Sequence, residues 1–201
     1  MKSIITTFLF LLTFGLTQAQ TKNILEYQIF SASGDTFTVG GLAQQKPIVI
    51  FFMSTKCKWS EFYNDRFNEY YTNFNSKVFP IFLSVSDDAS WNDVTKLVQS
   101  NYYAFSPYRE VEKKITTDFA VTKTPSVCIF SAEGNLIYKG RIDNTPREYT
   151  SIIGSFVQNI TEKMLSGEPV KYSEQNPLVG CDLPKPPAPP AVPVTPLKGT
   201  E

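Results

Sequence analysis

The 201-residue sequence contains no histidine and only three cysteines. Without histidine there can be no Ser-His-Asp triad, no Cys-His dyad, and no zinc, copper or haem site that needs an imidazole ligand. Three cysteines are too few for a four-thiolate zinc site or an iron–sulfur cluster held by one chain. The 19 basic and 19 acidic side chains give no basic excess of the kind that favours nucleic-acid binding. What remains is thiol and carboxylate chemistry, with no metal, cofactor or nucleic-acid partner expected.

The first twenty residues have the pattern of a secretory signal peptide. Lys2 precedes an apolar run over residues 4–16, and Ala19 ends a Thr-Gln-Ala sequence with small residues at the cleavage positions. The run is too short for a membrane-spanning helix, which needs about 20 apolar residues. We therefore expect cleavage after Ala19 and a periplasmic or extracellular mature chain without a membrane span. Disulfides persist in those compartments.

Apolar runs and helical spacings alternate through the middle of the chain. The predicted strands cover residues 48–53, 78–85, 126–130 and 136–142. The predicted helices cover residues 58–74, 90–100, 110–119 and 146–165, and a hairpin is expected within residues 21–42. Parallel βαβ units followed by a hairpin and a covering helix predict an α/β fold, with a central mixed β-sheet flanked by helices.

The composition changes after the last predicted helix. Residues 184–196 contain seven prolines among 13 positions, without apolar periodicity. Such a segment is extended and cannot build a core. We therefore divide the chain into a signal peptide (1–19), a folded domain (20–166), a C-terminal segment with Cys181 (167–183) and a disordered proline-rich tail (184–201).

Cys57 lies four residues after a predicted buried strand and opens a predicted helix. The backbone N–H groups of a first helical turn and the flanking Lys56 and Lys58 favour thiolate over thiol. They are expected to lower the pKa of Cys57 below the free-thiol value of about 8.5. A thiolate is the form that attacks disulfides and peroxides. The alternative is a buried and unreactive cysteine.

Residues 48–57, the strand order and Thr124-Pro125 before a predicted strand resemble the thioredoxin-like superfamily. The closer resemblance is to its redoxin branch, which includes peroxiredoxins and secreted thiol–disulfide proteins. The resemblance implies a thioredoxin-like fold with an N-terminal hairpin extension, and Cys57 as the active cysteine. It also implies a cis Thr124–Pro125 bond in a loop that packs on the active sulfur and receives extended peptides. We expect Thr124, Pro125 and Trp59 to bind substrate.

Two departures from the family patterns limit the chemistry. Thioredoxins have Cys-x-x-Cys, whereas Ser60 stands at the second position here. The Ser60 hydroxyl can donate a hydrogen bond to a Cys57 thiolate but cannot release a mixed disulfide, so a dithiol cycle within this motif is excluded. Compared with the peroxiredoxin motif, Ser54 matches the hydroxyl position, but Ile50 replaces the proline. The peroxiredoxin arginine has only two candidates, Arg66 and Arg141.

The other two cysteines have different expected roles. Cys128 lies in the predicted strand 126–130 and is expected to be a small core residue. Cys181 lies in a Gly-Cys segment that resembles the C-terminal end of some secreted redoxin-like proteins. This resemblance implies that Cys181 folds back and resolves a mixed disulfide on Cys57. Sequence alone allows three pairings among the cysteines, a static structural disulfide, or an external thiol instead.

Two functions fit these residues. The first is an exported thiol-dependent oxidoreductase in which Cys57 attacks a protein disulfide or a small peroxide, with Cys181 or an outside thiol as resolving group. It would need a thiol reductant as partner, and the sequence does not predict an oligomeric state. The second is a non-catalytic thioredoxin-fold binding module in the cell envelope. The position of Cys57 between two lysines favours the first, and Ser60 in place of a second thiol favours the second.

Overall fold

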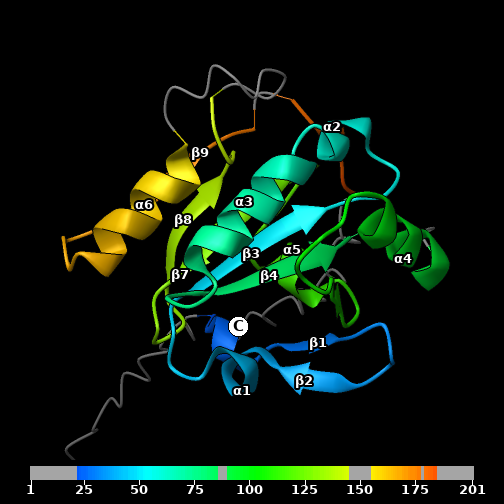
Figure 1. Cartoon of the computed structure of the whole chain (residues 1–201). Coiled ribbons are helices and arrows are strands. Elements are labelled where there is room, and N and C mark those ends of the chain that lie inside the picture. The colour runs from blue at the N-terminus through cyan, green and yellow to red at the C-terminus, as the bar shows by residue number, and fades with distance from the viewer. Residues whose placement is uncertain (1–21, 86–89, 145–154, 178, 185–201) are drawn as a thin grey trace, which may run out of the picture.

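The structure is a computed structural model of the chain, and it describes residues 22–85, 90–144, 155–177 and 179–184. At its centre lies a five-stranded sheet in the order β4-β3-β7-β8-β9 (Figure 1). Its strands are β3 (Ile48–Met53), β4 (Phe79–Ser84), β7 (Ser126–Phe130), β8 (Leu136–Gly140) and β9 (Ser173–Gln175). β3 is parallel to β4 and antiparallel to β7, while β8 is antiparallel to β7 and parallel to β9. This confirms the predicted mixed α/β sheet.

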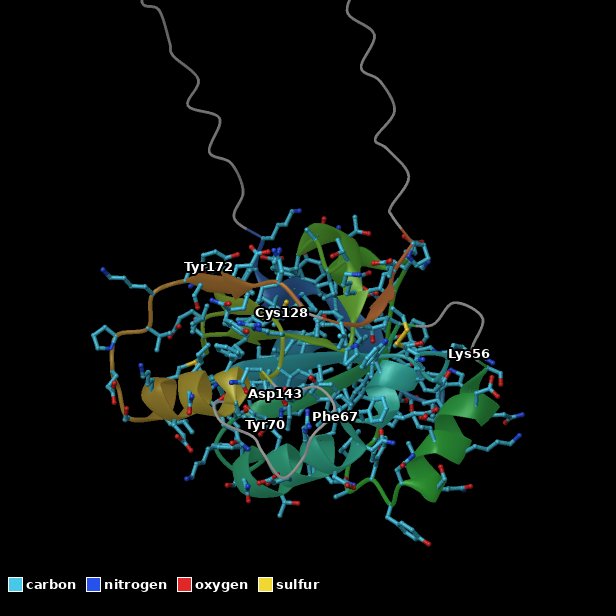
Figure 2. The ribbon with its side chains drawn as sticks, turned by 90° about the horizontal axis from the view of Figure 1, so that it is seen from above. Lys56, Phe67, Tyr70, Cys128, Asp143 and Tyr172 are labelled. Atoms are coloured by element: carbon cyan, nitrogen blue, oxygen red, sulfur yellow. A yellow bond between two sulfur atoms is a disulfide. The ribbon has the colours of Figure 1, made fainter. Side chains whose placement is uncertain are left out.

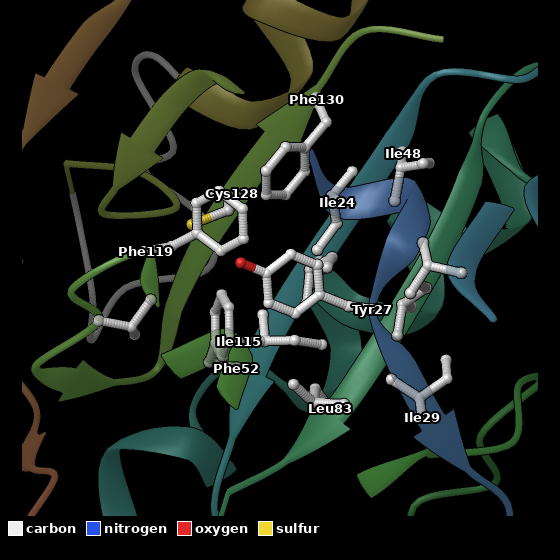
Figure 3. Close-up of a cluster of buried hydrophobic side chains, with 14 of the residues drawn as sticks. Ile24, Tyr27, Ile29, Ile48, Phe52, Leu83, Ile115, Phe119, Cys128 and Phe130 are labelled. Atoms are coloured by element: carbon white, nitrogen blue, oxygen red, sulfur yellow. The ribbon is translucent and has the colours of Figure 1, made fainter. Parts of the chain in front are cut away.

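All six residues of β3 are buried, because alternate side chains enter two separate cores. Ile48, Ile50 and Phe52 face what we call the N-terminal core. Its members include Ile24, Tyr27, Ile29, Ile48, Ile50, Phe52, Ile115, Phe119, Cys128 and Phe130 (Figure 3). Val49, Phe51 and Met53 face the helical core on the other side of the sheet. Its members include Val49, Phe51, Met53, Phe67, Tyr70, Phe82, Val127, Ile129, Tyr138 and Val157.

Two helices, α3 (Asn64–Phe74) and α6 (Phe156–Leu165), cover the face of the sheet that holds the helical core (Figure 1). The other face is covered by α5 (Lys114–Asp118) and by the N-terminal elements. These N-terminal elements are the 3-10 helix η1 (Ile24–Glu26), β1 (Gln28–Phe30), β2 (Thr36–Thr38) and α1 (Val39–Ala43). β1 and β2 pair in antiparallel register, which confirms the predicted N-terminal hairpin.

Helix α4 (Trp91–Ser100) begins where the sequence predicts. Ser90 is its N-cap, and Ser90 and Asp93 form a reciprocal capping box. The predicted helix over residues 58–74 is instead divided into α2 (Lys58–Glu61) and α3, with Phe62 and Tyr63 between them. Of the predicted helix 146–165, residues 156–165 are helical, and residues 146–154 lie outside the described part of the chain.

The prediction of a helix over residues 110–119 is wrong at its start. Glu110 belongs to the short strand β5 (Arg109–Glu110), which pairs with β1, and the helix itself begins at Lys114. The buried Glu110 carboxylate accepts hydrogen bonds from the Thr116 N–H at 2.8 Å and the Thr116 hydroxyl at 2.6 Å. Residues 109 and 110 therefore pair with β1 as a strand, although the local sequence pattern favours a helix at Glu110.

The C-terminal segment contains strands that the sequence pattern did not predict. β9 extends the central sheet beside β8, and β10 (Cys181–Asp182) pairs with β6 (Lys123–Thr124). The predicted signal peptide and nearly all of the proline-rich tail lie outside the described residues, so those assignments stay predictions. In the ranges that are described, no helix combines the length and the apolar character needed to cross a membrane.

The aromatic part of the helical core gives a stability prediction. Phe51 is 1% exposed, and its ring centroid lies 5.4 Å from that of Phe67, 4.9 Å from Tyr70 and 5.1 Å from Phe82. We expect Phe51→Ala to lower the free energy of unfolding by about 3–5 kcal/mol in urea titrations, because it leaves a cavity among rigid rings. Tyr102→Ala is the matched control: Tyr102 is 88% exposed, and its loss should change stability by less than about 0.5 kcal/mol. Equal effects of the two substitutions would contradict this account of the core.

Candidate functional site

Cys57 lies at the carboxyl end of β3, after a tight turn. Its N–H donates to the Ser54 carbonyl at 3.3 Å, and the Lys56 N–H donates to the Ser54 hydroxyl at 3.1 Å. Cys57 is the N-cap residue of α2, as predicted, but α2 is a single four-residue turn. The Cys57 side chain is buried, at 2% exposure. Any contribution of the helix start to thiolate stability therefore comes from a few N–H groups rather than from a long helix dipole.

The structure pairs Cys57 with Cys181 in a disulfide across 124 residues of sequence, with a Cα–Cα distance of 5.9 Å (Figure 2). Of the three pairings open to the sequence, this is the one that the resemblance implied. Cys128 is free and buried, as predicted: it lies on β7, and its side chain is part of the N-terminal core (Figure 3). Burial raises the pKa of its thiol, so Cys128 stays protonated and unreactive.

The Thr124–Pro125 bond is cis, which confirms the prediction. Thr124 is buried, and its hydroxyl donates to the Phe52 carbonyl at 3.1 Å. The Thr124 carbonyl oxygen lies 3.4 Å from the Cys57 sulfur. The cis-proline loop therefore packs directly against the disulfide.

Ser60 links the cysteine turn to the cis-proline loop. Its buried hydroxyl accepts a hydrogen bond from the Ser54 N–H at 3.2 Å and lies 3.5 Å from the Thr124 hydroxyl. These contacts belong to the disulfide form of the site. A hydrogen bond from Ser60 to a Cys57 thiolate concerns the reduced form and stays a prediction.

The side chains flanking Cys57 lie at the molecular surface. Lys56 Nζ lies 3.8 Å from an Asp93 carboxylate oxygen, with both side chains more than a third exposed (Figure 2). Lys58 Nζ lies 5.9 Å from the Trp59 ring centroid, and the rings of Trp59 and the exposed Phe62 are 5.8 Å apart. Trp59 follows Cys57 by two residues and is half-buried, and its role in substrate binding stays a prediction.

Both candidate arginines are engaged by neighbouring side chains, and Arg141 lines a small hollow together with Pro125 and Asp143. Arg66 Nη1 donates to the Asp143 carboxylate at 2.7 Å, and the pair is buried. Arg141 Nη2 donates a hydrogen bond to the Gln175 side-chain oxygen at 3.2 Å, and Arg141 Cζ lies 4.8 Å from the centroid of the Phe156 ring. Nothing in these contacts favours the peroxide-binding role of the peroxiredoxin arginine.

The buried Arg66–Asp143 pair is a feature of the site that sequence reasoning missed. The Tyr63 hydroxyl donates to Asp143 at 3.2 Å, and Tyr63 and Asp143 line a small hollow with Pro125. Burial, followed by the Asp143 carboxylate, raises the pKa of Tyr63, so the phenol stays protonated and keeps donating. The sequence did contain a signal that Arg66 is buried. Arg66 lies three residues after Tyr63 and four before Tyr70, on the apolar face of the predicted helix.

Among the residues that the structure describes, no group of three or more cysteine, aspartate and glutamate side chains is arranged to hold a metal ion.

Comparison with known proteins agrees with this geometry. The family model described as "Thioredoxin-like" matches residues 44–136, which include β3, Cys57 and the cis-proline loop. No curated protein matches the sequence. Residues 44–136 therefore match the thioredoxin-like pattern that the resemblance predicted.

Solved structures with the same fold are distant in sequence. An uncharacterised conserved protein from Geobacillus kaustophilus superimposes with a TM-score of 0.69 at 17% identity, covering 84% of this chain and 93% of its own. A hypothetical protein from Sinorhizobium meliloti 1021 superimposes with a TM-score of 0.68 at 15% identity, and the match covers 81% of this chain and 92% of that protein. The thioredoxin domain of a thiol-disulfide oxidoreductase from Bacteroides vulgatus superimposes with a TM-score of 0.55 at 15% identity, and the match covers 74% of this chain and 99% of that domain. At these identities the likeness establishes the fold alone.

The cysteine assignments can be checked by alkylation and mass mapping. In the air-oxidised native protein we expect no cysteine to react with iodoacetamide, because two form the disulfide and Cys128 is buried. Unfolding in urea without reductant should expose Cys128 alone, and native reduction should expose Cys57 and Cys181. Alkylation of Cys57 in the oxidised protein would contradict the pairing.

The Arg66–Asp143 pair gives a second stability prediction. Asp143→Ala leaves the Arg66 guanidinium buried without its carboxylate, which should cost about 3–5 kcal/mol of unfolding free energy. Glu174→Ala is the control, since it removes one partner of the partly exposed Lys139–Glu174 pair at 3.2 Å, worth about 0–1 kcal/mol. Similar losses in thermal or urea unfolding would show that the Asp143 pair is not buried as described.

Proposed function

We propose that the protein is an exported thiol–disulfide oxidoreductase that uses Cys57 as nucleophile and Cys181 as resolving thiol. The observation that carries the proposal is the Cys57–Cys181 disulfide, which lies against the cis-proline loop at the carboxyl end of β3. Its two sulfurs come from separate parts of the chain, so the pair can separate without unfolding the sheet. Export is proposed from the signal-peptide pattern of residues 1–19.

The proposed reaction is two successive thiol–disulfide exchanges. The Cys57 thiolate attacks one sulfur of a substrate disulfide, forming a mixed disulfide and releasing the other substrate sulfur as a thiolate. The Cys181 thiolate then attacks the Cys57 sulfur, which forms the Cys57–Cys181 disulfide and releases the second substrate thiolate. The substrate gains two electrons and the protein loses two, so a thiol reductant must regenerate the protein. The same steps in reverse oxidise a dithiol.

The local structure supports Cys181 rather than Ser60 as the resolving group. Ser60 has no thiol, and its hydroxyl is held by Ser54 and Thr124. Cys181 lies on β10, a strand of two residues paired only with the two residues of β6. Such a short ladder contributes little by itself, so β10 can leave its place when the disulfide opens. A disulfide substrate is favoured over a peroxide, because Ile50 replaces the peroxiredoxin proline and the side chains of Arg66 and Arg141 are engaged with Asp143 and Gln175.

Trapping of the mixed disulfide tests this function. When reduced protein is mixed with oxidised glutathione, Cys181→Ser should accumulate a glutathione adduct on Cys57, detected by intact mass. The wild type should release glutathione and form the internal disulfide, and Cys57→Ser should form neither product. Cys128→Ala is the matched control and should behave as the wild type, since Cys128 lies in the core.

The non-catalytic binding module predicts a different outcome of the same experiment. A static structural disulfide, once reduced, would leave Cys57 no more reactive than a free thiol, and Cys181→Ser would accumulate no more adduct than an unfolded control peptide. That result would overturn the oxidoreductase proposal and leave a thioredoxin-like domain that binds partners without turnover.

A further inference from the structure

Strand β10 occupies the edge of β6 beside the cis-proline. Cys181 pairs with Thr124 and Asp182 with Lys123 in antiparallel register, and the Leu183 N–H donates to the Thr122 carbonyl at 2.8 Å. Main-chain pairing of this kind is how an extended peptide adds to an exposed sheet edge. The disulfide to Cys57 completes the arrangement expected of a peptide caught as a mixed disulfide. Residues 180–183 therefore show which side chains this edge accepts around a reactive cysteine.

The position before the cysteine is open only to glycine. Gly180 has a φ of +148°, and a Cβ atom added there would lie 2.8 Å from the Thr124 carbonyl oxygen. Any L side chain would meet backbone rather than a flexible group, and the positive φ would add strain. A cysteine presented to this edge in the same way needs glycine immediately before it.

The position after the cysteine faces a positive charge. Asp182 lies across from Lys123, with 2.6 Å between the Asp182 carboxylate oxygen and Lys123 Nζ. The Lys123 side chain is 35% exposed and that of Asp182 81%, so the pair is accessible to water. An exposed pair of this kind selects modestly for an acidic residue and against a basic one.

The next position is apolar. Leu183 is half-buried and packs against the N-terminal core. Burial of part of a leucine side chain favours an apolar residue two positions after the cysteine. The three positions together define a segment of glycine, cysteine, an acidic residue and an apolar residue.

Building on the oxidoreductase function above, we propose that this site prefers protein partners whose reactive cysteine lies in an extended Gly-Cys-acidic-apolar segment. Residues 180–183 are then an intramolecular copy of that segment, and they compete with the partner for the edge of β6. In the encounter, the Cys57 thiolate attacks the partner cysteine within the partner's disulfide. The Cys57–partner bond forms, and the partner's other sulfur leaves as a thiolate.

The test measures capture of activated peptides by the full-length Cys181→Ser protein, which cannot resolve the product. Each peptide is a short synthetic segment whose cysteine is a 2-thiopyridyl mixed disulfide, so attack by Cys57 releases 2-thiopyridone, followed by absorbance. The peptides contain Gly-Cys-Asp-Leu, Gly-Cys-Lys-Leu, Ala-Cys-Asp-Leu and Gly-Cys-Asp-Ser. A 2-thiopyridyl derivative of N-acetylcysteine amide serves as the reagent without peptide.

We expect Gly-Cys-Asp-Leu to react fastest. Replacing its glycine with alanine should slow capture about tenfold, because of the contact with the Thr124 carbonyl and the positive φ. Replacing its aspartate with lysine should slow capture about two- to fivefold at low salt, with a smaller effect at high salt. Replacing leucine with serine should also slow capture.

A charge exchange on the protein separates recognition from general reactivity. In the full-length protein carrying both Cys181→Ser and Lys123→Glu, the ratio of rates between the Asp and Lys peptides should invert. Because the ratio compares two peptides on one variant, it is independent of any change in Cys57 reactivity.

The possible results distinguish the two proposals. If all peptides and the N-acetylcysteine reagent react at equal rates, and faster than with an unfolded thiol peptide, the sequence preference is wrong and the oxidoreductase function stands. If neither the peptides nor the N-acetylcysteine reagent reacts faster than with an unfolded thiol peptide, the oxidoreductase function fails and the preference fails with it. An unchanged Asp-to-Lys ratio with Lys123→Glu would overturn the charge-recognition part of the proposal.

Discussion

Antiparallel pairing of β3 with β7 brings the two loops of the site together. Phe52 is opposite Ser126 in that register, so the chain that leaves β3 and the chain that enters β7 meet at the same end of the sheet. Cys57 follows on the first chain, and the cis Thr124–Pro125 bond precedes the second. The hydrogen bond from the Thr124 hydroxyl to the Phe52 carbonyl joins these two segments of the chain directly. Because β3 is buried on both faces by two cores, this end of the sheet is a rigid platform. The disulfide, the Ser60 contacts and the pairing of β10 all depend on that platform.

The Cys57–Cys181 disulfide is what holds the C-terminal segment most firmly at this end of the sheet. The Cys57–Cys181 disulfide ties Cys181 covalently to the loop after β3, across 124 residues of sequence. The other attachments of this segment are the two-residue ladder and the exposed Lys123–Asp182 pair, which is worth about 0–1 kcal/mol. The Leu183 N–H also donates to the Thr122 carbonyl, and the half-buried Leu183 side chain packs against the N-terminal core. Reduction removes the largest of these constraints. The edge of β6 is then available to another strand, at a cost much smaller than that of unfolding the domain.

The parts of the site that the sequence predicted are those with strong local patterns. Six apolar residues in a row define β3, Cys57 stands at a strand-to-helix turn, and Ser126–Phe130 follows Thr124-Pro125. Features created by contacts between distant segments were missed or misplaced. Glu110 lies in strand β5, which pairs with β1, and not in the predicted helix. Strand β10 forms by pairing with the distant strand β6. The Arg66–Asp143 pair joins residues 77 apart, and neither position indicates its partner. The cysteine pairing came from a family resemblance, because spacing alone left three choices.

Replacing the second cysteine of a Cys-x-x-Cys motif with Ser60 has a structural consequence beyond the loss of a thiol. In a Cys-x-x-Cys motif the two cysteines are three residues apart, so their disulfide closes within about one helical turn. Here the second thiol comes from β10, so the oxidised state necessarily places a strand on the edge of β6. Formation of this disulfide therefore requires β10 to lie on the edge of β6. In the proposed function, a partner peptide reaches Cys57 beside the cis-proline after Cys181 has left, when the protein is reduced. Thr124 stands at the centre of this coupling, since its carbonyl contacts the Cys57 sulfur while its backbone pairs with Cys181.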